Sequence, residues 1–157
     1  MDVRNAEEHE INHLANLWCQ GWLDAHEQIV PEELKRIRTP DSFGPRLMRF
    51  LPSIRVVGPT GAPVGFHIVK DDELYQLYVA AEARGAGVAA KLITDAEDLL
   101  AERGVETAWL ACAIGNDRAA RFYEKCGWQR VGNMINHLET KNAVFDLEVW
   151  RYEKSLR

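Results

Sequence analysis

The sequence predicts an α/β (α+β) domain in which a mixed sheet carries helices on its faces. Three observations support this fold class: an amphipathic first third, a run of short β-branched segments after residue 52, and a second half that alternates strand and helix patterns. The chain has 157 residues and shows no repeat, low-complexity tract or linker, so we expect one domain over residues 1–157.

The first half is predicted to contain two helices followed by two strands. Apolar side chains recur at helical spacing over residues 8–27, and Pro31 can open a second, short helix. Proline and glycine cluster over residues 39–65, where we expect loops. Two β-branched runs at 54–57 and 62–69 are typical of strands, and the segment between them suits a hairpin turn.

The second half begins with a near-continuous apolar run at residues 73–79, which is typical of a central strand. Residues 87–103 give the strongest helix prediction, with one apolar face, one acidic face, and Gly104 at the end. The elements expected after it are a strand at 107–114, a short helix at 116–126 ended by Gly127, and two strands at 129–139 and 143–152 around a turn at 139–142.

The composition excludes several classes of protein. Hydrophobic residues make up 46% and charged residues 27%, as in an ordinary globular protein. The net charge of −5 and the lack of a Lys/Arg run disfavour a nucleic-acid partner. The acidic start is unlike a signal peptide and no apolar stretch is long enough to cross a bilayer, so we expect a cytoplasmic protein without a membrane partner. Cys19, Cys112 and Cys126 are widely spaced, which predicts free thiols and no metal site.

The segment at residues 84–90, Arg-Gly-Ala-Gly-Val-Ala-Ala, lies between a predicted strand and a predicted helix. Free backbone N–H groups and the positive end of the helix dipole favour an anion there. Gly85 and Gly87 have no Cβ, so a pyrophosphate can approach the main chain, and Arg84 can add charged donors. The same glycines could instead serve only a tight turn between strand and helix.

A dinucleotide-binding fingerprint is an alternative for this segment. Residues 85–90 spell G-x-G-x-x-A, and Glu106 lies at about the sequence distance expected of an acid that binds ribose. However, the first glycine does not follow its strand directly, and the chain lacks a second mononucleotide-binding half. An NAD-type protein is therefore the less favoured interpretation.

Two motifs together resemble the GNAT superfamily of acetyl-CoA-dependent N-acetyltransferases. The first, R/Q-x-x-G-x-G/A, is matched by Arg84, Gly87 and Ala89. The second is matched at the family's spacing by Asn116, Ala119, Ala120, Phe122, Tyr123, Glu124, Lys125 and Gly127. The resemblance implies a mostly antiparallel central sheet of about seven strands with helices on both faces, and a cofactor-binding core at about 73–132. It also implies acetyl (acyl) transfer from acetyl-CoA to a primary amine by direct attack in a ternary complex.

The resemblance also assigns roles to particular residues. The cofactor-binding residues it implies are Leu77, Tyr78, Val79, Arg84, Gly85, Ala86, Gly87, Val88, Ala89, Asn116 and Tyr123. Backbone groups of the 77–79 strand would bond the pantetheine arm and polarise the thioester carbonyl. Tyr123 would protonate the leaving thiolate, and Glu73 lies where some histone-acetylating relatives have their base. Tyr123 could equally be a core tyrosine, Asn116 only a helix cap, and Glu73 a solvated acid.

The resemblance implies a small-molecule or peptide amine as acceptor, but the sequence does not say which. Specificity is expected from Trp18, Trp22, His26, the 43–50 loop region and the strand around His137. Of these, the two tryptophans are better interpreted as core residues. A non-catalytic acyl-CoA-binding or sensor domain is the alternative from a different class, because it would keep the fold without an acceptor site.

A homodimer is conceivable. Its contacts would come from apolar residues of the last strand, Phe145, Leu147, Val149 and Trp150. Interior packing would give the same pattern, so both interpretations stay open.

Overall fold

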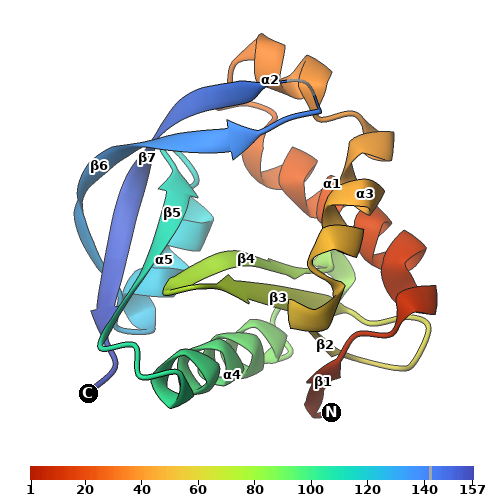
Figure 1. The fold of residues 1–157 in the computed structure, drawn as a ribbon, viewed down its shortest axis with the longest axis vertical. Coiled ribbons are helices and arrows are strands. Elements are labelled where there is room, and N and C mark those ends of the chain that lie inside the picture. The colour runs from red at the N-terminus through yellow and green to blue at the C-terminus, as the bar shows by residue number, and fades with distance from the viewer. Residues whose placement is uncertain (142) are drawn as a thin grey trace.

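A seven-stranded sheet forms the centre of the computed structural model, which describes residues 1–141 and 143–157 (Figure 1). The strands are β1 (Val3–Asn5), β2 (Ile54–Val57), β3 (Gly65–Lys70), β4 (Glu73–Val79), β5 (Thr107–Ala113), β6 (Gln129–Glu139) and β7 (Val144–Ser155). The α-helices are α1 (Ile11–His26), α2 (Glu32–Ile37), α3 (Phe43–Arg49), α4 (Val88–Glu102) and α5 (Asp117–Lys125).

The strands follow the order β1-β2-β3-β4-β5-β7-β6, and every neighbouring pair is antiparallel except β4 and β5. This mixed, mostly antiparallel sheet confirms the predicted fold class. The parallel pair β4–β5 is joined through a single register pair, Glu73 with Trp109. Beyond that pair the two strands separate, as Figure 1 shows. The sheet therefore opens at its centre, on the side where β4 leads into residues 84–90.

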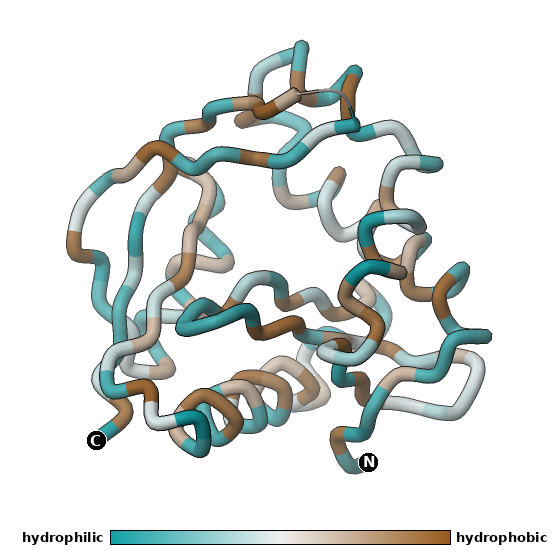
Figure 2. Tube along the Cα trace, in the orientation of Figure 1, coloured by the Kyte–Doolittle hydropathy of each residue, from teal (hydrophilic) through white to brown (hydrophobic). Residues whose placement is uncertain are grey.

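Helices cover both faces of the sheet. On one face α1 and α3 pack against β3 and β4, and their core contains the fully buried Trp18, Phe43 and Phe66. On the other face α4 lies under β3 and β4 with Leu92 and Leu100 buried. Figure 2 shows the apolar colour along β3 and along α4 beneath it. Two cores, one on each face, fix β4 between them.

Most predicted elements agree with the structure to within a few residues at their ends. The segments at 54–57, 73–79 and 129–139 are strands with those bounds, and the predicted helix at 87–103 is α4. Gly104 and Gly127 follow helices with φ of 84° and 91°, the left-handed conformation that favours glycine. The predicted turn at 139–142 includes residue 142, which lies outside the described residues.

The prediction of a loop at residues 43–50 is wrong, because α3 occupies this segment. Pro45 lies in the first turn of α3, where a backbone N–H has no acceptor within the helix, so the missing donor costs nothing. Phe43 and Leu47, four residues apart, are both fully buried and hold the helix on the core. Strand β1 was not predicted either, since three residues are too few to show an alternating pattern.

Candidate active site

A cavity of about 520 Å³ lies where β4 and β5 separate. Its walls come from α1, from β4, from the segment at residues 84–90, from β5 and from α5. All the predicted cofactor-binding residues line this cavity except Ala86. The two motifs singled out in the sequence, far apart along the chain, therefore meet at one site.

The glycine segment presents its main chain to the cavity. Gly85 and Gly87 have φ of 84° and 80°, and nothing lies within 4 Å of the place where a Cβ would stand on either residue. The first backbone hydrogen bond of α4 runs from the Lys91 N–H to the Gly87 carbonyl. The N–H groups of residues 88–90 consequently have no acceptor within the helix. With the positive end of the α4 dipole they can bind an anion.

Three basic side chains line the same cavity, as a polyanionic ligand would require. Arg84 is the one predicted, and its Nη2 also lies 3.5 Å from Oδ2 of Asp24 on α1. Both partners of this ion pair are exposed to solvent, so the pair is weak and the guanidinium can exchange partners. Arg118 and Lys125 were not predicted. With Phe122 they follow i, i+4, i+7 spacing, which places them on one face of α5.

Strand β4 supplies the long wall of the cavity. On one edge Leu77, Tyr78 and Val79 pair with β3, while their other edge faces the gap and has no strand partner. Backbone groups on that edge can bond a ligand, as expected for a pantetheine arm. A Cβ at Gly21 would lie 2.6 Å from Cδ1 of Tyr78, so this glycine of α1 leaves room for the tyrosine ring. A glycine inside a helical pattern was the available signal for this approach.

Tyr123 enters the cavity from α5. Burial raises its pKa above the ordinary value, and the nearby Cys112 and Tyr78 act in the same direction. The phenol is therefore protonated at neutral pH and can donate a proton. Its ring lies against Trp128 and Tyr152, each with a centroid distance of 6.3 Å. These contacts fix the position of the hydroxyl-bearing side chain.

Cys112, one of the three predicted free thiols, lines the cavity from β5. Burial raises its pKa to about 12, so almost none of it is thiolate at neutral pH. Its Sγ donates weakly to the carbonyls of Ala113 and Asn116, at 3.9 and 3.8 Å. Asn116 caps α5 by accepting from the Ala119 N–H at 3.4 Å. A protonated thiol disfavours a covalent acetyl-cysteine intermediate.

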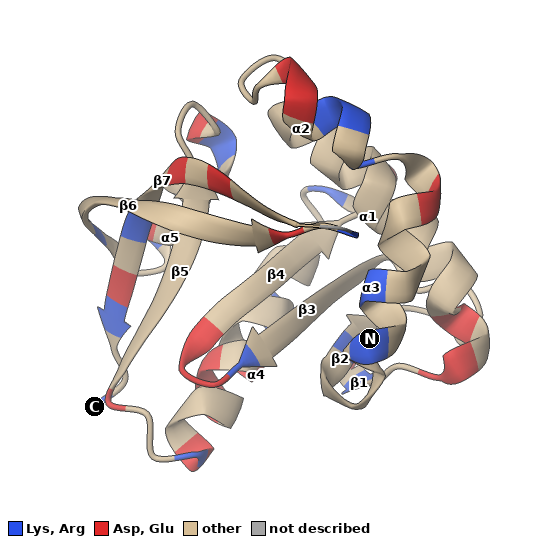
Figure 3. Cartoon of the chain, turned by 45° about the horizontal axis from the view of Figure 1, so that its top comes forward, with Lys and Arg blue, Asp and Glu red and all other residues tan. Residues whose placement is uncertain are grey.

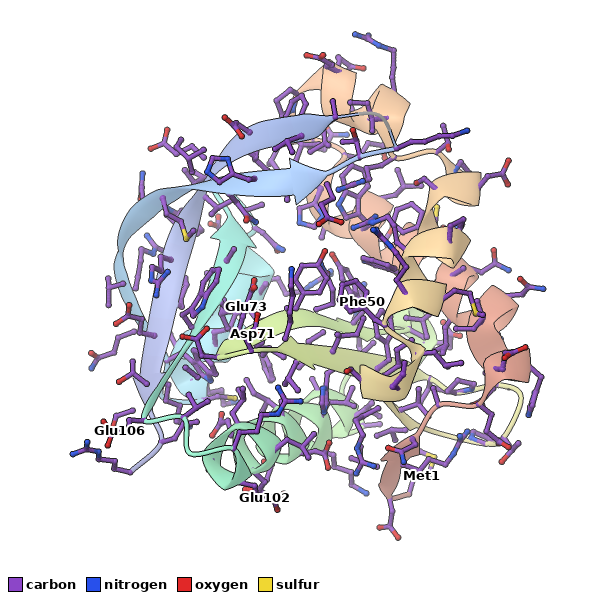
Figure 4. The ribbon with its side chains drawn as sticks, in the orientation of Figure 1. Met1, Phe50, Asp71, Glu73, Glu102 and Glu106 are labelled. Carbon is purple, nitrogen blue, oxygen red and sulfur yellow. The ribbon has the colours of Figure 1, made fainter. Side chains whose placement is uncertain are left out.

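Glu73 does not line the cavity. It begins β4 beside the acidic β3–β4 turn, which Figure 3 shows in red and Figure 4 shows with Asp71 and Glu73 labelled. Burial raises its pKa to about 7, and the neighbouring Asp72 and Asp71 also raise it. The side chain is half-buried and so differs from a fully solvated acid of the Asp71–Glu73 run. A carboxyl that titrates near neutral pH suits a general base.

The acid expected by the dinucleotide interpretation lies elsewhere. Glu106 follows α4 and forms an ion pair with Arg157 (Figure 4). The 15 residues of α4, about 22 Å of helix, separate it from the glycine segment. The sheet is also mostly antiparallel rather than doubly wound and parallel. The structure thus contradicts the NAD-type alternative.

The residues expected to set acceptor specificity lie in different parts of the fold. Trp18 and Trp22 are 0% and 9% exposed, which confirms that they belong to the core. His26 lines the cavity, and burial lowers its pKa to about 4. His137 lies exposed on the β6–β7 hairpin with its Nδ1 2.6 Å from Oδ1 of Asp146.

The residues proposed for a dimer contact also pack within this one chain. Phe145 and Leu147 lie against the core under α1 and α3, Val149 is buried, and Arg130 stacks on Trp150 with its Cζ 3.7 Å from the ring centroid. Interior packing accounts for their apolar character. No helix among the described residues is long and apolar enough to cross a membrane. Over the same residues, no group of His, Cys, Asp and Glu is arranged to hold a metal ion.

Comparisons with known proteins agree with this geometry. The family model described as "Acetyltransferase (GNAT) family" matches residues 13–128, most of the chain. No curated protein sequence matches significantly.

Among solved structures, the chain is similar to a GCN5-related N-acetyltransferase from Rhodopseudomonas palustris, at 22% identity and a TM-score of 0.73, covering 98% of this chain and 94% of that one. It is similar to an N-acetyltransferase from Staphylococcus aureus Mu50, at 19% identity and a TM-score of 0.74, covering 99% and 98%. It is also similar to a putative acetyltransferase from Salmonella typhimurium, solved with its cofactor acetyl-CoA, at 16% identity and a TM-score of 0.72, covering 100% and 94%. With both cofactor motifs gathered around one cavity and the family model spanning them, the chain belongs to the acetyltransferase (GNAT) family.

Proposed function

We propose that this chain transfers an acetyl group from acetyl-CoA to a primary amine, with both substrates bound together. One observation carries the proposal: the cavity between β4 and β5 joins an anion-binding main chain at residues 85–90 to the protonated phenol of Tyr123. A cofactor with a pyrophosphate at one end and a thioester at the other requires this pair of features. The solved Salmonella typhimurium relative was obtained with acetyl-CoA, which supports the same cofactor here.

The chain's own residues would act in two places on the cofactor. The N–H groups of residues 88–90 and the basic side chains of Arg84, Arg118 and Lys125 would hold the phosphates. The unpaired edge of β4 would bond the pantetheine arm and donate to the thioester oxygen as negative charge develops on it. Tyr123 would protonate the departing sulfur as a general acid.

The acceptor amine must lose a proton, because only its neutral form is a nucleophile. We propose Glu73 as the group that takes this proton, on the ground that its pKa of about 7 matches neutral conditions. Since Glu73 does not line the cavity, the proton would pass through intervening water. Direct attack by the amine is favoured over a relay through Cys112, whose thiol stays protonated.

A non-catalytic acyl-CoA sensor is the second candidate. It would use the same glycine segment and the same cavity. A sensor needs neither a phenol beside the sulfur nor a carboxyl that titrates near neutral pH, so Tyr123 and Glu73 favour the enzyme. A measurement of acetyl transfer distinguishes the two candidates, because only the enzyme would transfer the acetyl group to an amine.

The first test is thermal unfolding with acetyl-CoA, CoA and NAD, each titrated separately. A ligand that binds only the folded protein raises the free energy of unfolding, by about 2.7 kcal/mol at a ligand concentration of 100 Kd, and Tm rises with it. We expect acetyl-CoA and CoA to raise Tm and NAD to leave it unchanged.

The Gly87→Glu variant should lose the shift, because a carboxylate would stand at the anion site. Gly104→Glu is the matched control: its φ of 84° is close to the 80° of Gly87, its Cβ position is also open, and it lies at the other end of α4. A shift that survives Gly87→Glu, or a shift with NAD alone, would refute the proposed cofactor site.

A further inference from the structure

Two arginines, one buried and one half-buried, lie on the α1–α3 face of the sheet, where the end of β6 reaches over (Figure 1). Arg38 follows α2 and is only 5% exposed. Arg46 lies on α3 with its Nη1 out of contact with solvent. The Cζ of Arg46 lies 4.2 Å from the centroid of the Trp18 ring and 5.4 Å from that of Phe43. Guanidinium nitrogens are thus withdrawn from water into an aromatic setting.

Neither arginine forms an ion pair with any residue that the structure describes. Arg38 Nη1 donates to the backbone carbonyl of Glu139 at 2.9 Å, while the carboxylate of Glu139 pairs instead with Arg49 at 3.1 Å. Arg46 has the two aromatic faces beneath it. Burial lowers its pKa and a hydrogen bond with the hydroxyl group of Tyr75 acts to raise it, but no carboxylate among the described residues pairs with it. A buried charge without a counter-charge is costly, so its presence requires a reason.

Other partly buried arginines of this chain are matched by carboxylates. Arg4 makes two hydrogen bonds to Glu10, of 3.0 and 2.7 Å, and Arg55 makes two to Asp95, of 3.1 and 3.0 Å. The pKa of each of those arginines is raised by its partner. Burial and the nearby charge of Arg46 together lower the pKa of Arg38 to about 10. The two arginines therefore form a concentrated positive charge that the fold itself leaves uncompensated.

Unused donors meet at the same place. Arg46 Nη1 and Trp18 Nε1 are both buried and have no hydrogen-bond partner among the described residues. Both groups can only donate. The remaining buried side-chain atom without a partner, Nδ1 of His67, lies on the α4 side of the sheet, where the other ring nitrogen meets Asp95. The indole N–H of Trp18, beside two guanidinium groups that lack a carboxylate partner among the described residues, calls for an acceptor with negative charge.

This charge lies next to the cavity. Tyr75 and Tyr78 of β4 both line the cavity, and both affect the pKa of Arg38 and of Arg46. The arginines are on the α1–α3 side of β4, whereas the glycine segment that would hold the cofactor leads into α4 on the opposite side. An anion bound here would be part of the acceptor rather than of the cofactor.

We infer that the acceptor amine carries a carboxylate, which Arg38, Arg46 and the indole N–H of Trp18 bind while the amino group faces the cavity. A planar carboxylate fits guanidinium groups and can accept from several donors at once. The acceptor class is thus amino acids and other amines with a free carboxylate. This inference rests on the proposed acetyl transfer and narrows its substrate.

The test compares acceptors that differ only in the carboxylate. Acetyl transfer is measured at saturating acetyl-CoA for each proteinogenic amino acid beside its carboxamide, which keeps the amine and the side chain. We expect at least one acid to exceed its amide by about tenfold or more in kcat/KM, the value of a charge-assisted hydrogen bond. The amide has the more acidic ammonium group and hence more neutral amine, so intrinsic reactivity opposes this preference.

Matched variants locate the effect. Arg46→Met should raise KM for the preferred acid by about tenfold or more and should raise KM for the amide much less. Trp18→Phe keeps an aromatic ring at this position but removes the N–H together with part of the indole ring, and should weaken the same preference less. Arg49→Met removes an exposed arginine one turn along α3 and should preserve the preference. If Arg46→Met does not fold, Trp18→Phe and Arg38→Gln carry the test.

Three outcomes would overturn the inference: amides that match their acids in the wild type, Arg49→Met losing the preference as fully as Arg46→Met, or a polyamine or aminoglycoside outperforming every acid. If nothing is acetylated, the same pairs are compared by thermal unfolding in saturating CoA. A Tm shift that depends on the carboxylate and on Arg46 supports the inference, and its absence overturns it. Failure of acetyl-CoA itself to raise Tm refutes the proposed function instead.

Discussion

Acid should destabilise the folded protein through His26, a residue at the end of α1 that lines the cavity. Its Nδ1 donates to the Trp22 carbonyl at 2.9 Å, and burial lowers its pKa from 6.5 to about 4. Between about pH 4 and pH 6.5 the unfolded chain therefore binds more protons at His26 than the folded protein does. The free energy of unfolding falls as pH drops below about 6.5, and the loss is complete below about 4.

These two pKa values set the size of the effect. Between pH 7 and pH 4.5, linkage at this single site removes about 2 kcal/mol from the free energy of unfolding. His67 and Asp95, whose pKa values are also lowered in the fold, contribute losses of the same sign. A comparison with a variant at His26 cancels those shared losses.

Urea unfolding of the wild type, His26→Gln and His137→Gln at pH 7 and pH 4.5 measures the difference. The wild type should lose about 2 kcal/mol more than His26→Gln over this interval. His137→Gln should behave as the wild type does, because the His137 side chain is 69% exposed. An equal loss in the wild type and His26→Gln would show that burial of this imidazole does not perturb its titration.

Three further predictions concern the site. Because the pKa of Glu73 is about 7 and its ionised form is the base, kcat/KM should rise with pH through about 7. Glu73→Gln should lower kcat/KM about 100-fold or more and abolish this rise with pH. An unchanged pH profile in Glu73→Gln would exclude Glu73 as the general base. Tyr123→Phe should lower kcat by about 100-fold while the Tm shift with acetyl-CoA persists, whereas an unchanged kcat would leave the tyrosine as packing only. Gly21→Ala would place a Cβ 2.6 Å from the Tyr78 ring and should lower the free energy of unfolding, measured in urea, by about 1–3 kcal/mol. In the control Gly44→Ala in α3, the Cβ meets nothing within 4 Å, and the free energy of unfolding should rise by about 0.5–1 kcal/mol. Equal effects of the two substitutions would contradict the contact between Gly21 and Tyr78.

The sequence predicted elements well where one physical signal dominates. The apolar run at 73–79 and the two-faced pattern of α4 reflect burial, and burial decides the conformation there. The prediction is wrong at α3, because Gly44 and Pro45 favour a loop locally while burial of Phe43 and Leu47 in the core stabilises a helix. Local propensity is a weak guide when tertiary packing opposes it.

The candidate site was predictable in part for a similar reason. The glycine segment is a local feature of backbone conformation, and its positive φ angles can be anticipated from the residues themselves. The meeting of Arg38 with Arg46 depends on how α2 and α3 cross the sheet, and no spacing in the chain reveals it. That neither arginine has a carboxylate partner among the described residues becomes visible only when their neighbours in the fold are known. Gly21 was predictable only in part: a glycine inside a helix indicates a close approach, but the sequence does not reveal that Tyr78 is the residue that approaches it.

Because β4 and β5 are joined through a single register pair, the sheet consists of two parts, β1 to β4 and β5 to β7, which are connected only at one end. A ligand that lies along the free edge of β4 supplies hydrogen bonds that a neighbouring strand would otherwise make. The cofactor is then part of the architecture as well as a reagent, and amide protons of β4 should exchange more slowly when it is bound. The hydrogen bonds along β4 would have to break and form again in each turnover. We therefore expect the release of CoA, rather than acetyl transfer, to limit kcat.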